Sequence, residues 1–164
     1  MNTTTGRGNY RKWIALGVFL AIAFAVSFIG SLVTLPKIPL WYAGLVKPSF
    51  NPPAWIFGPV WTLLYAMMSI AAWRVWASFG HPGRNNALGW YFGQLVLNAV
   101  WSPVFFGLEQ PRLALGVIAA LLVAIIFTIA RFWPIDRVAA WMLAPYLAWV
   151  SFATILNASI VALN

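Results

Sequence analysis

Apolar residues form five long runs along this chain, and short polar or proline-rich segments separate them. The runs cover residues 13–35, 54–77, 87–108, 113–133 and 138–163. Each run is longer than the roughly 18 residues that mark a candidate membrane-crossing helix. Arg74 lies near the end of the second run, where its side chain can extend along the helix to the interface. The pattern predicts an all-α integral membrane protein, a bundle of five transmembrane helices.

The longest connection, residues 36–53, is rich in proline and aromatic residues. Pro48, Pro52 and Pro53 each restrict the backbone and lack an N–H donor, so this segment cannot continue a helix. Asn51 is a predicted N-cap, with the next helix starting at Pro52. We therefore predict a rigid aromatic loop that covers a pocket between the helices.

Composition supports the membrane class, because 63% of the residues are hydrophobic and 7% are charged. Such a chain has too few polar side chains to cover a soluble globule. The first run also exceeds the apolar core of a cleaved signal peptide, which spans about 7–15 residues. Residues 1–12 are thus predicted to be a polar tail, and residues 13–164 a single transmembrane domain.

Basic residues are unevenly distributed between the two sides of the predicted helices. The tail and the second and fourth connections carry Arg7, Arg11, Lys12, Arg84, Arg131 and Arg137. The positive-inside rule then predicts a cytoplasmic N-terminus, and five crossings place the C-terminus and the long loop on the opposite side. The net charge of +8 is explained by anionic lipid headgroups and requires no nucleic acid.

Three of the predicted helices carry aromatic and polar residues at i, i+3 and i+4 spacing. These stripes are Gly58, Trp61, Tyr65 and Met68; Gln94, Asn98, Trp101 and Phe105; and Tyr146, Trp149, Ala153 and Asn157. Stripes of this kind are typical of ordinary helix packing. Amides are costly in hydrocarbon, however, so Gln94, Asn98 and Asn157 are expected to face the interior, bonded to partners, water or ligand.

Prolines and tryptophans favour a pocket over simple packing. Pro59, Pro103 and Pro145 each leave a backbone acceptor without its helical partner, and such kinks open space between helices. The chain has 11 tryptophans, and several fit an interfacial belt. Trp61, Trp101 and Trp149 lie too deep for a belt. A flat indole in an apolar pocket suits a flat aromatic ligand.

Gly89 and Gly93 form a G-x-x-x-G arrangement on the third run. Small residues at this spacing allow close helix approach in a membrane. The motif predicts either a homodimer interface or a contact with another helix of the same chain.

The sequence offers little for acid–base or metal chemistry. Its two carboxylates, Glu109 and Asp136, are predicted on opposite faces, and its single histidine, His81, is predicted in a cytoplasmic connection. No catalytic pair, metal site or cofactor is expected from this distribution. A haem protein is disfavoured too, because the only plausible axial ligands are Tyr65 and Tyr146, with Met67 and Met68 as weak ones. A proton-driven transporter is also disfavoured, because it needs an ionisable group inside the membrane.

Four segments resemble the TspO/MBR family in order and spacing. They are WYAGLVKPSFNPPAW at 41–55, GPVWTLLY at 58–65, NAVWSPVFFG at 98–107 and PYLAWVSFATILN at 145–157. This family comprises the bacterial tryptophan-rich sensory proteins and the translocator proteins, formerly peripheral benzodiazepine receptors. The resemblance extends from the first predicted helix to the fifth.

The resemblance implies a five-helix bundle, often dimeric, whose pocket binds porphyrins such as protoporphyrin IX, benzodiazepine-site ligands and, in some members, sterol. The positions that match the family's pocket are Tyr42, Trp61, Asn98, Trp101, Trp149, Ala153, Leu156 and Asn157. Phe50 stands where many members have tryptophan. The chain also lacks a tyrosine followed by a basic residue after 163, which argues against cholesterol as the natural ligand.

Three functions follow from these expectations. The first is a porphyrin-binding membrane receptor or translocator with a sensory, regulatory or transport role. The second is light- and oxygen-dependent porphyrin degradation, which the resemblance assigns to Trp61 and Trp149. The third is a structural or partner-regulating membrane protein.

In the first, the ligand enters beneath the loop and stacks on Trp61 and Trp149, with its propionates near Lys37 or Lys47. Trp61→Phe is then expected to weaken binding more than Trp133→Phe.

Overall fold

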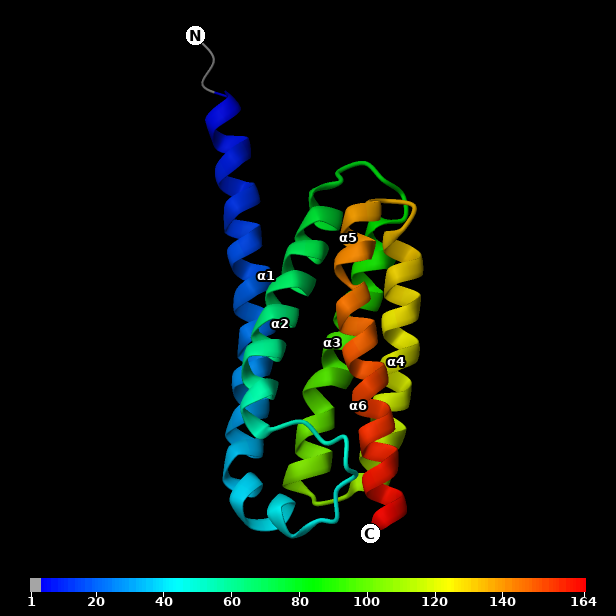
Figure 1. Cartoon of the computed structure of the whole chain (residues 1–164). Coiled ribbons are helices and arrows are strands. Elements are labelled where there is room, and N and C mark those ends of the chain that lie inside the picture. The colour runs from blue at the N-terminus through cyan, green and yellow to red at the C-terminus, as the bar shows by residue number, and fades with distance from the viewer. Residues whose placement is uncertain (1–3) are drawn as a thin grey trace.

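Figure 1 shows the computed structural model, which describes residues 4–164 and the side chains of residues 10–164. The elements in chain order are α1 (Thr4–Thr34), the 3₁₀ turn η1 (Leu35–Lys37), the π-helical turn η2 (Ile38–Tyr42), α2 (Ala54–Ala77), α3 (Arg84–Ser102), the π-helical turn η3 (Pro103–Gly107), α4 (Pro111–Phe132), α5 (Arg137–Met142) and α6 (Ala144–Leu163). The predicted all-helical architecture is thus found in this part of the chain.

The first helix extends further in both directions than the sequence pattern predicted. It begins at Thr4 instead of residue 13, and η1 and η2 continue the helical path to Tyr42. Pro36 and Pro39 lie in the first turns of η1 and η2, where a missing N–H donor has little cost. The irregular part of the predicted loop is therefore only its second half, residues 45–53.

Within the described residues, four helical segments are long and apolar enough to cross a membrane: Tyr10–Tyr42, Ala54–Ala77, Pro111–Phe132 and Arg137–Leu163. α3 is not among them, because Gln94, Asn98 and the polar residues of its first turn lower its hydropathy. The chain is accordingly a multi-pass membrane protein, and five crossings remain a prediction.

The last apolar run, predicted as one helix kinked at Pro145, is broken into two helices. α5 ends at Met142 and α6 starts at Ala144, with Pro145 in its first turn. At the start of α5, Asp136 caps the helix by accepting a hydrogen bond from the Ala139 backbone N–H at 3.0 Å. Its other carboxylate oxygen pairs with Arg74 at 2.8 Å. Arg74, predicted as an interfacial anchor, thus ties the end of α2 to α5.

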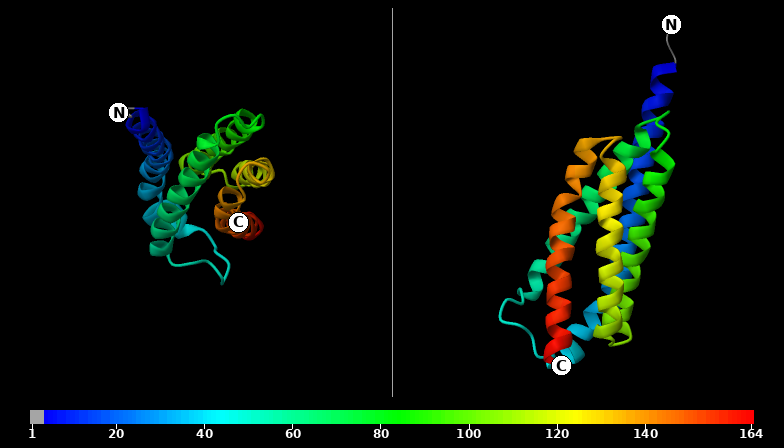
Figure 2. Two further views of the ribbon diagram at one scale, coloured as in Figure 1. Left: turned by 90° about the horizontal axis from the view of Figure 1, so that it is seen from above. Right: turned by 90° about the vertical axis from the view of Figure 1, so that its right-hand side faces the viewer.

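The helices form one bundle in which α1 packs on α2 and α3, α3 packs on α4, and α4 packs on α6. α2 packs against α5 but makes little contact with α6. Figure 2 shows the segment before α2 running across this side toward the end of α6. The end of α1, the start of α2 and the end of α6 share one end of the bundle, opposite the N-terminus (Figure 1). The divergence of α2 and α6 is what opens the candidate site.

Candidate functional site

A groove of about 400 Å³ runs between α2 and α6. Its lining residues are Val60, Leu63 and Leu64 from α2, and Pro145, Ala148, Trp149 and Phe152 from α6. The lining contains no charged, hydroxyl or amide side chain, and its volume falls within the roughly 300–1,000 Å³ of small-molecule sites. The groove is therefore suited to an apolar molecule.

Aromatic rings form one wall of this groove. The ring of Trp149 lies 5.7 Å from that of Phe57 and 5.7 Å from that of Phe152, measured between centroids. Phe50 from the loop packs edge-on against Phe152 at 6.2 Å. The indole Nε1 of Trp149 is buried and has no hydrogen-bond partner among the described residues. Burial of a donor without a partner is costly.

Behind the groove, a chain of hydrogen bonds links α2, α3 and α6. Tyr65 donates its hydroxyl proton to Asn98 Oδ1 at 2.6 Å, and Asn98 Nδ2 donates to the Tyr146 hydroxyl at 2.8 Å. Tyr146 in turn donates to Gln94 Oε1 at 2.8 Å. Trp61 lies against this network, with its ring 5.5 Å from Tyr65 and 6.3 Å from Tyr146. These polar groups therefore position the inner aromatic residues.

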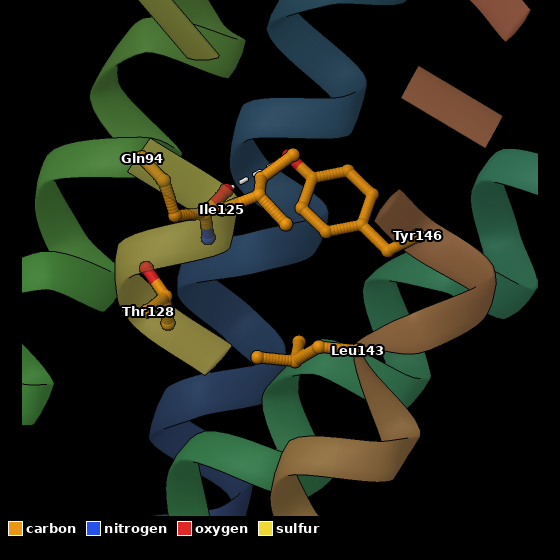
Figure 3. Close-up of a pocket in the computed structure, with 5 residues that line it drawn as sticks. All are labelled: Gln94, Ile125, Thr128, Leu143 and Tyr146. Atoms are coloured by element: carbon orange, nitrogen blue, oxygen red, sulfur yellow. Dashed lines mark hydrogen bonds between the residues drawn. The ribbon is translucent and has the colours of Figure 1, made fainter. Parts of the chain in front are cut away.

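A second, enclosed space lies at the far end of this network (Figure 3). Gln94, Ile125, Thr128, Leu143 and Tyr146 line it, and the space is too small to hold a water molecule. Gln94 Nε2 lacks a hydrogen-bond partner among the described residues. Since nothing fits between these side chains, this space is part of the packed core and not a ligand site.

A separate aromatic cluster fills the loop end of the bundle. Trp101 stacks on Phe105 at 5.1 Å and donates its indole N–H to Asn157 Oδ1 at 3.3 Å. Asn157 Nδ2 donates to the Pro111 carbonyl at 2.9 Å. Tyr42 packs on Phe105 at 6.3 Å. Both polar atoms of the Asn157 amide are thus engaged within the protein.

The structure therefore divides the predicted site residues into three groups. Trp61, Tyr65 and Asn98 belong to the hydrogen-bonded centre. Tyr42, Trp101, Phe105, Leu156 and Asn157 belong to the loop-end cluster. Trp149 lines the groove, and Ala153 is half-buried against the core beside it. As predicted, the amides of Gln94, Asn98 and Asn157 are buried.

Several residues of the groove were not predicted from the sequence. Phe152 and Pro145 lie three residues after and four residues before Trp149, so the helical spacing of that stripe could have indicated them. Phe57 lies four residues before Trp61, so the stripe on α2 could have indicated it in the same way. Val60, Leu63 and Leu64 carried no signal, because ordinary aliphatic residues on a membrane helix do not distinguish a groove from lipid contact.

One prediction about the loop is wrong. Asn51 does not cap α2, because Pro53 occupies the N-cap position and the helix begins at Ala54. Asn51 Oδ1 instead accepts a hydrogen bond from the Tyr42 hydroxyl at 2.9 Å. Lys37, predicted as a partner for ligand carboxylates, forms an ion pair with Glu109 at 2.7 Å, and a ligand would have to compete with Glu109 for it.

The other predicted carboxylate partner, Lys47, is engaged within the loop. It donates to the carbonyls of Ala43 and Leu45 at 3.2 and 3.0 Å. Its ammonium also lies 4.9 Å from the centre of the Tyr42 ring, close enough for a cation–π interaction. A ligand carboxylate would have to compete with these contacts.

Gly89 and Gly93 both lie on an exposed face of α3. A Cβ atom added at either glycine would meet no atom of the described residues within 4 Å. The alternative that they pack against another helix of the same chain is therefore wrong.

Comparison with known proteins agrees with the motifs of the four segments. A family model described as the TspO/MBR family matches residues 19–163. The chain is 43% identical over 141 residues to the tryptophan-rich protein TspO of Archaeoglobus fulgidus, covering 85% of this chain and 90% of the relative.

Two further relatives are similar over most of their length. The human translocator protein is 40% identical over 148 residues, which are 88% of this chain and 87% of the relative. The tryptophan-rich sensory protein of Cereibacter sphaeroides is 39% identical over 152 residues, covering 93% and 92%. The chain belongs to the TspO/MBR family.

Proposed function

We propose that this protein is a membrane receptor or translocator that binds a porphyrin such as protoporphyrin IX in the groove between α2 and α6. The observation that carries the proposal is the apolar groove walled by Trp149 and Phe152. A tetrapyrrole is flat and aromatic, so it can stack on these rings. The lining of the groove is apolar throughout, which suits the macrocycle of such a ligand.

We propose five membrane crossings, with the N-terminus in the cytoplasm. α3 packs between α1 and α4. Its amides Gln94 and Asn98 are buried, whereas the apolar Val96 is exposed on its outer face, as suits contact with lipid. The basic bias of the tail supports the orientation. Because the chain has no cysteine, single cysteines at Ser78 and Ser49 can be labelled from either side. Labelling of both from the same side would contradict this topology.

A second candidate function is light- and oxygen-dependent degradation of the bound porphyrin. This function is favoured by the indole of Trp149, an oxidisable group that lines the groove. Trp61 does not line the groove but packs against Tyr65 and Tyr146. The resemblance to the family is what assigns these two tryptophans to the reaction.

One titration distinguishes the two functions. Protoporphyrin IX is added to the purified protein in the dark and then under light with oxygen, while tryptophan fluorescence and porphyrin absorption are followed. Saturable quenching with an unchanged absorption spectrum supports a receptor or translocator. Protein-dependent bleaching that Trp149→Phe abolishes supports degradation. Absence of saturable quenching would contradict porphyrin binding.

We also propose that Gly89 and Gly93 form a homodimer interface, because their exposed face lets a second helix approach closely. Gly93→Leu is expected to shift the protein from dimer to monomer in light scattering. Gly116→Leu is the matched control, since Gly116 is equally open on α4. Equal masses for the wild type and Gly93→Leu would contradict this interface.

A further inference from the structure

The groove between α2 and α6 is open along its outer side. Leu63 is 60% exposed, and Pro145 and Ala148 are exposed across from it, whereas Leu64 is buried at the inner side. α2 and α6 both belong to segments that can cross a membrane. The outer side of the groove therefore faces the hydrocarbon of the bilayer, and its apolar lining suits that contact.

In contrast to the open side of the groove, the loop of residues 45–53 is held in place by hydrogen bonds. The side chain of Asn164 accepts a hydrogen bond from the Val46 N–H at 3.0 Å and donates one to the Val46 carbonyl at 3.0 Å. The Tyr42 hydroxyl bonds to Asn51 at 2.9 Å. Lifting this segment therefore breaks several hydrogen bonds at once.

We infer that the gap between α2 and α6 is a lateral portal. A flat aromatic ligand passes through it between the bilayer and the groove, while residues 45–53 stay fastened to α6. This inference rests on the proposed function for its ligand. It replaces the predicted path beneath the loop, because an apolar ligand dissolved in the bilayer meets the open side of the groove directly. Leu63 and Ala148 are the rim of the portal, and Trp149 lies inside it.

The absence of cysteine from the sequence allows a direct test with paired cysteines. Leu63→Cys with Ala148→Cys, joined by a flexible, cleavable bis-maleimide, bridges the portal. Val46→Cys with Asn164→Cys, joined in the same way, fastens the loop permanently and is the matched control. The rates of protoporphyrin IX association and dissociation are then measured by tryptophan quenching in lipid nanodiscs, before and after the linker is cleaved.

The portal bridge is expected to slow both rates by at least about tenfold, because the ligand must wait for a rarer opening, and cleavage restores them. The loop bridge leaves both rates within about twofold of the unbridged protein. Slowing by the loop bridge alone, by both bridges equally, or by neither overturns the portal.

A failure of the proposed ligand is distinguishable from a failure of the portal. If the wild type shows no saturable quenching by protoporphyrin IX, the porphyrin assignment is wrong. The same two bridged proteins are then compared with diphenylhexatriene, an uncharged aromatic probe that dissolves in bilayers, by energy transfer from tryptophan. Transfer that the portal bridge slows and the loop bridge does not supports the portal. Any other result overturns it.

Discussion

Replacing Trp149 with alanine is expected to weaken protoporphyrin IX binding by about 30- to 1,000-fold. Truncating a central aromatic anchor commonly costs about 2–4 kcal/mol of binding free energy. Trp149 combines a ring on the groove wall with a buried N–H that lacks a partner among the described residues. Fluorescence quenching titrations of the purified variants measure the effect.

Two other tryptophans provide graded controls for this result. Trp133→Ala should leave the affinity unchanged, because its ring packs on Trp141 outside the groove. Trp61→Phe should weaken binding by about 2- to 10-fold, since its ring supports the groove through Tyr65 and Tyr146 without lining it. If Trp149→Ala and Trp133→Ala bind porphyrin equally well, the groove is not the binding site.

Replacing Asn98 with leucine is expected to lower the free energy of unfolding by about 1–4 kcal/mol. Asn98 accepts a hydrogen bond from Tyr65 and donates one to Tyr146. Leucine removes both bonds and leaves the Tyr65 hydroxyl buried without an acceptor. A buried group that loses its partner costs more than the bond itself contributes. Unfolding in detergent, followed by circular dichroism, measures the change.

The double variant makes this prediction specific to the network. Adding Tyr65→Phe to Asn98→Leu removes the stranded hydroxyl, so the double variant is expected to be more stable than Asn98→Leu alone. Val96→Ala, on the exposed face of the same helix, should change stability little. A double variant less stable than Asn98→Leu would show that the hydroxyl does not depend on Asn98.

Helical spacing was sufficient to predict which polar residues share the interior. Gln94, Asn98 and Tyr146 occupy stripes whose period matches an α-helix, and they meet in one hydrogen-bonded chain. The cost of an amide in hydrocarbon leaves few other arrangements. Their proximity to a ligand is a further step, which spacing alone does not determine.

The loop could not be predicted in the same way, because its structure depends on competing partners. Asn51 can cap a helix or accept a hydrogen bond from a tyrosine, and the Tyr42 hydroxyl binds it here. Lys37 finds Glu109 across 72 positions of sequence, a pairing that local pattern does not contain. The groove could not be predicted from the sequence either, because its width depends on how far α2 and α6 diverge, which local sequence patterns do not determine.

The most direct test of the groove as the ligand site is an experimental structure of the protein with protoporphyrin IX bound. The macrocycle is expected between α2 and α6, stacked on Trp149 and Phe152. A porphyrin bound against the loop-end cluster of Trp101 and Phe105, or on the outer face of α3, would contradict the account.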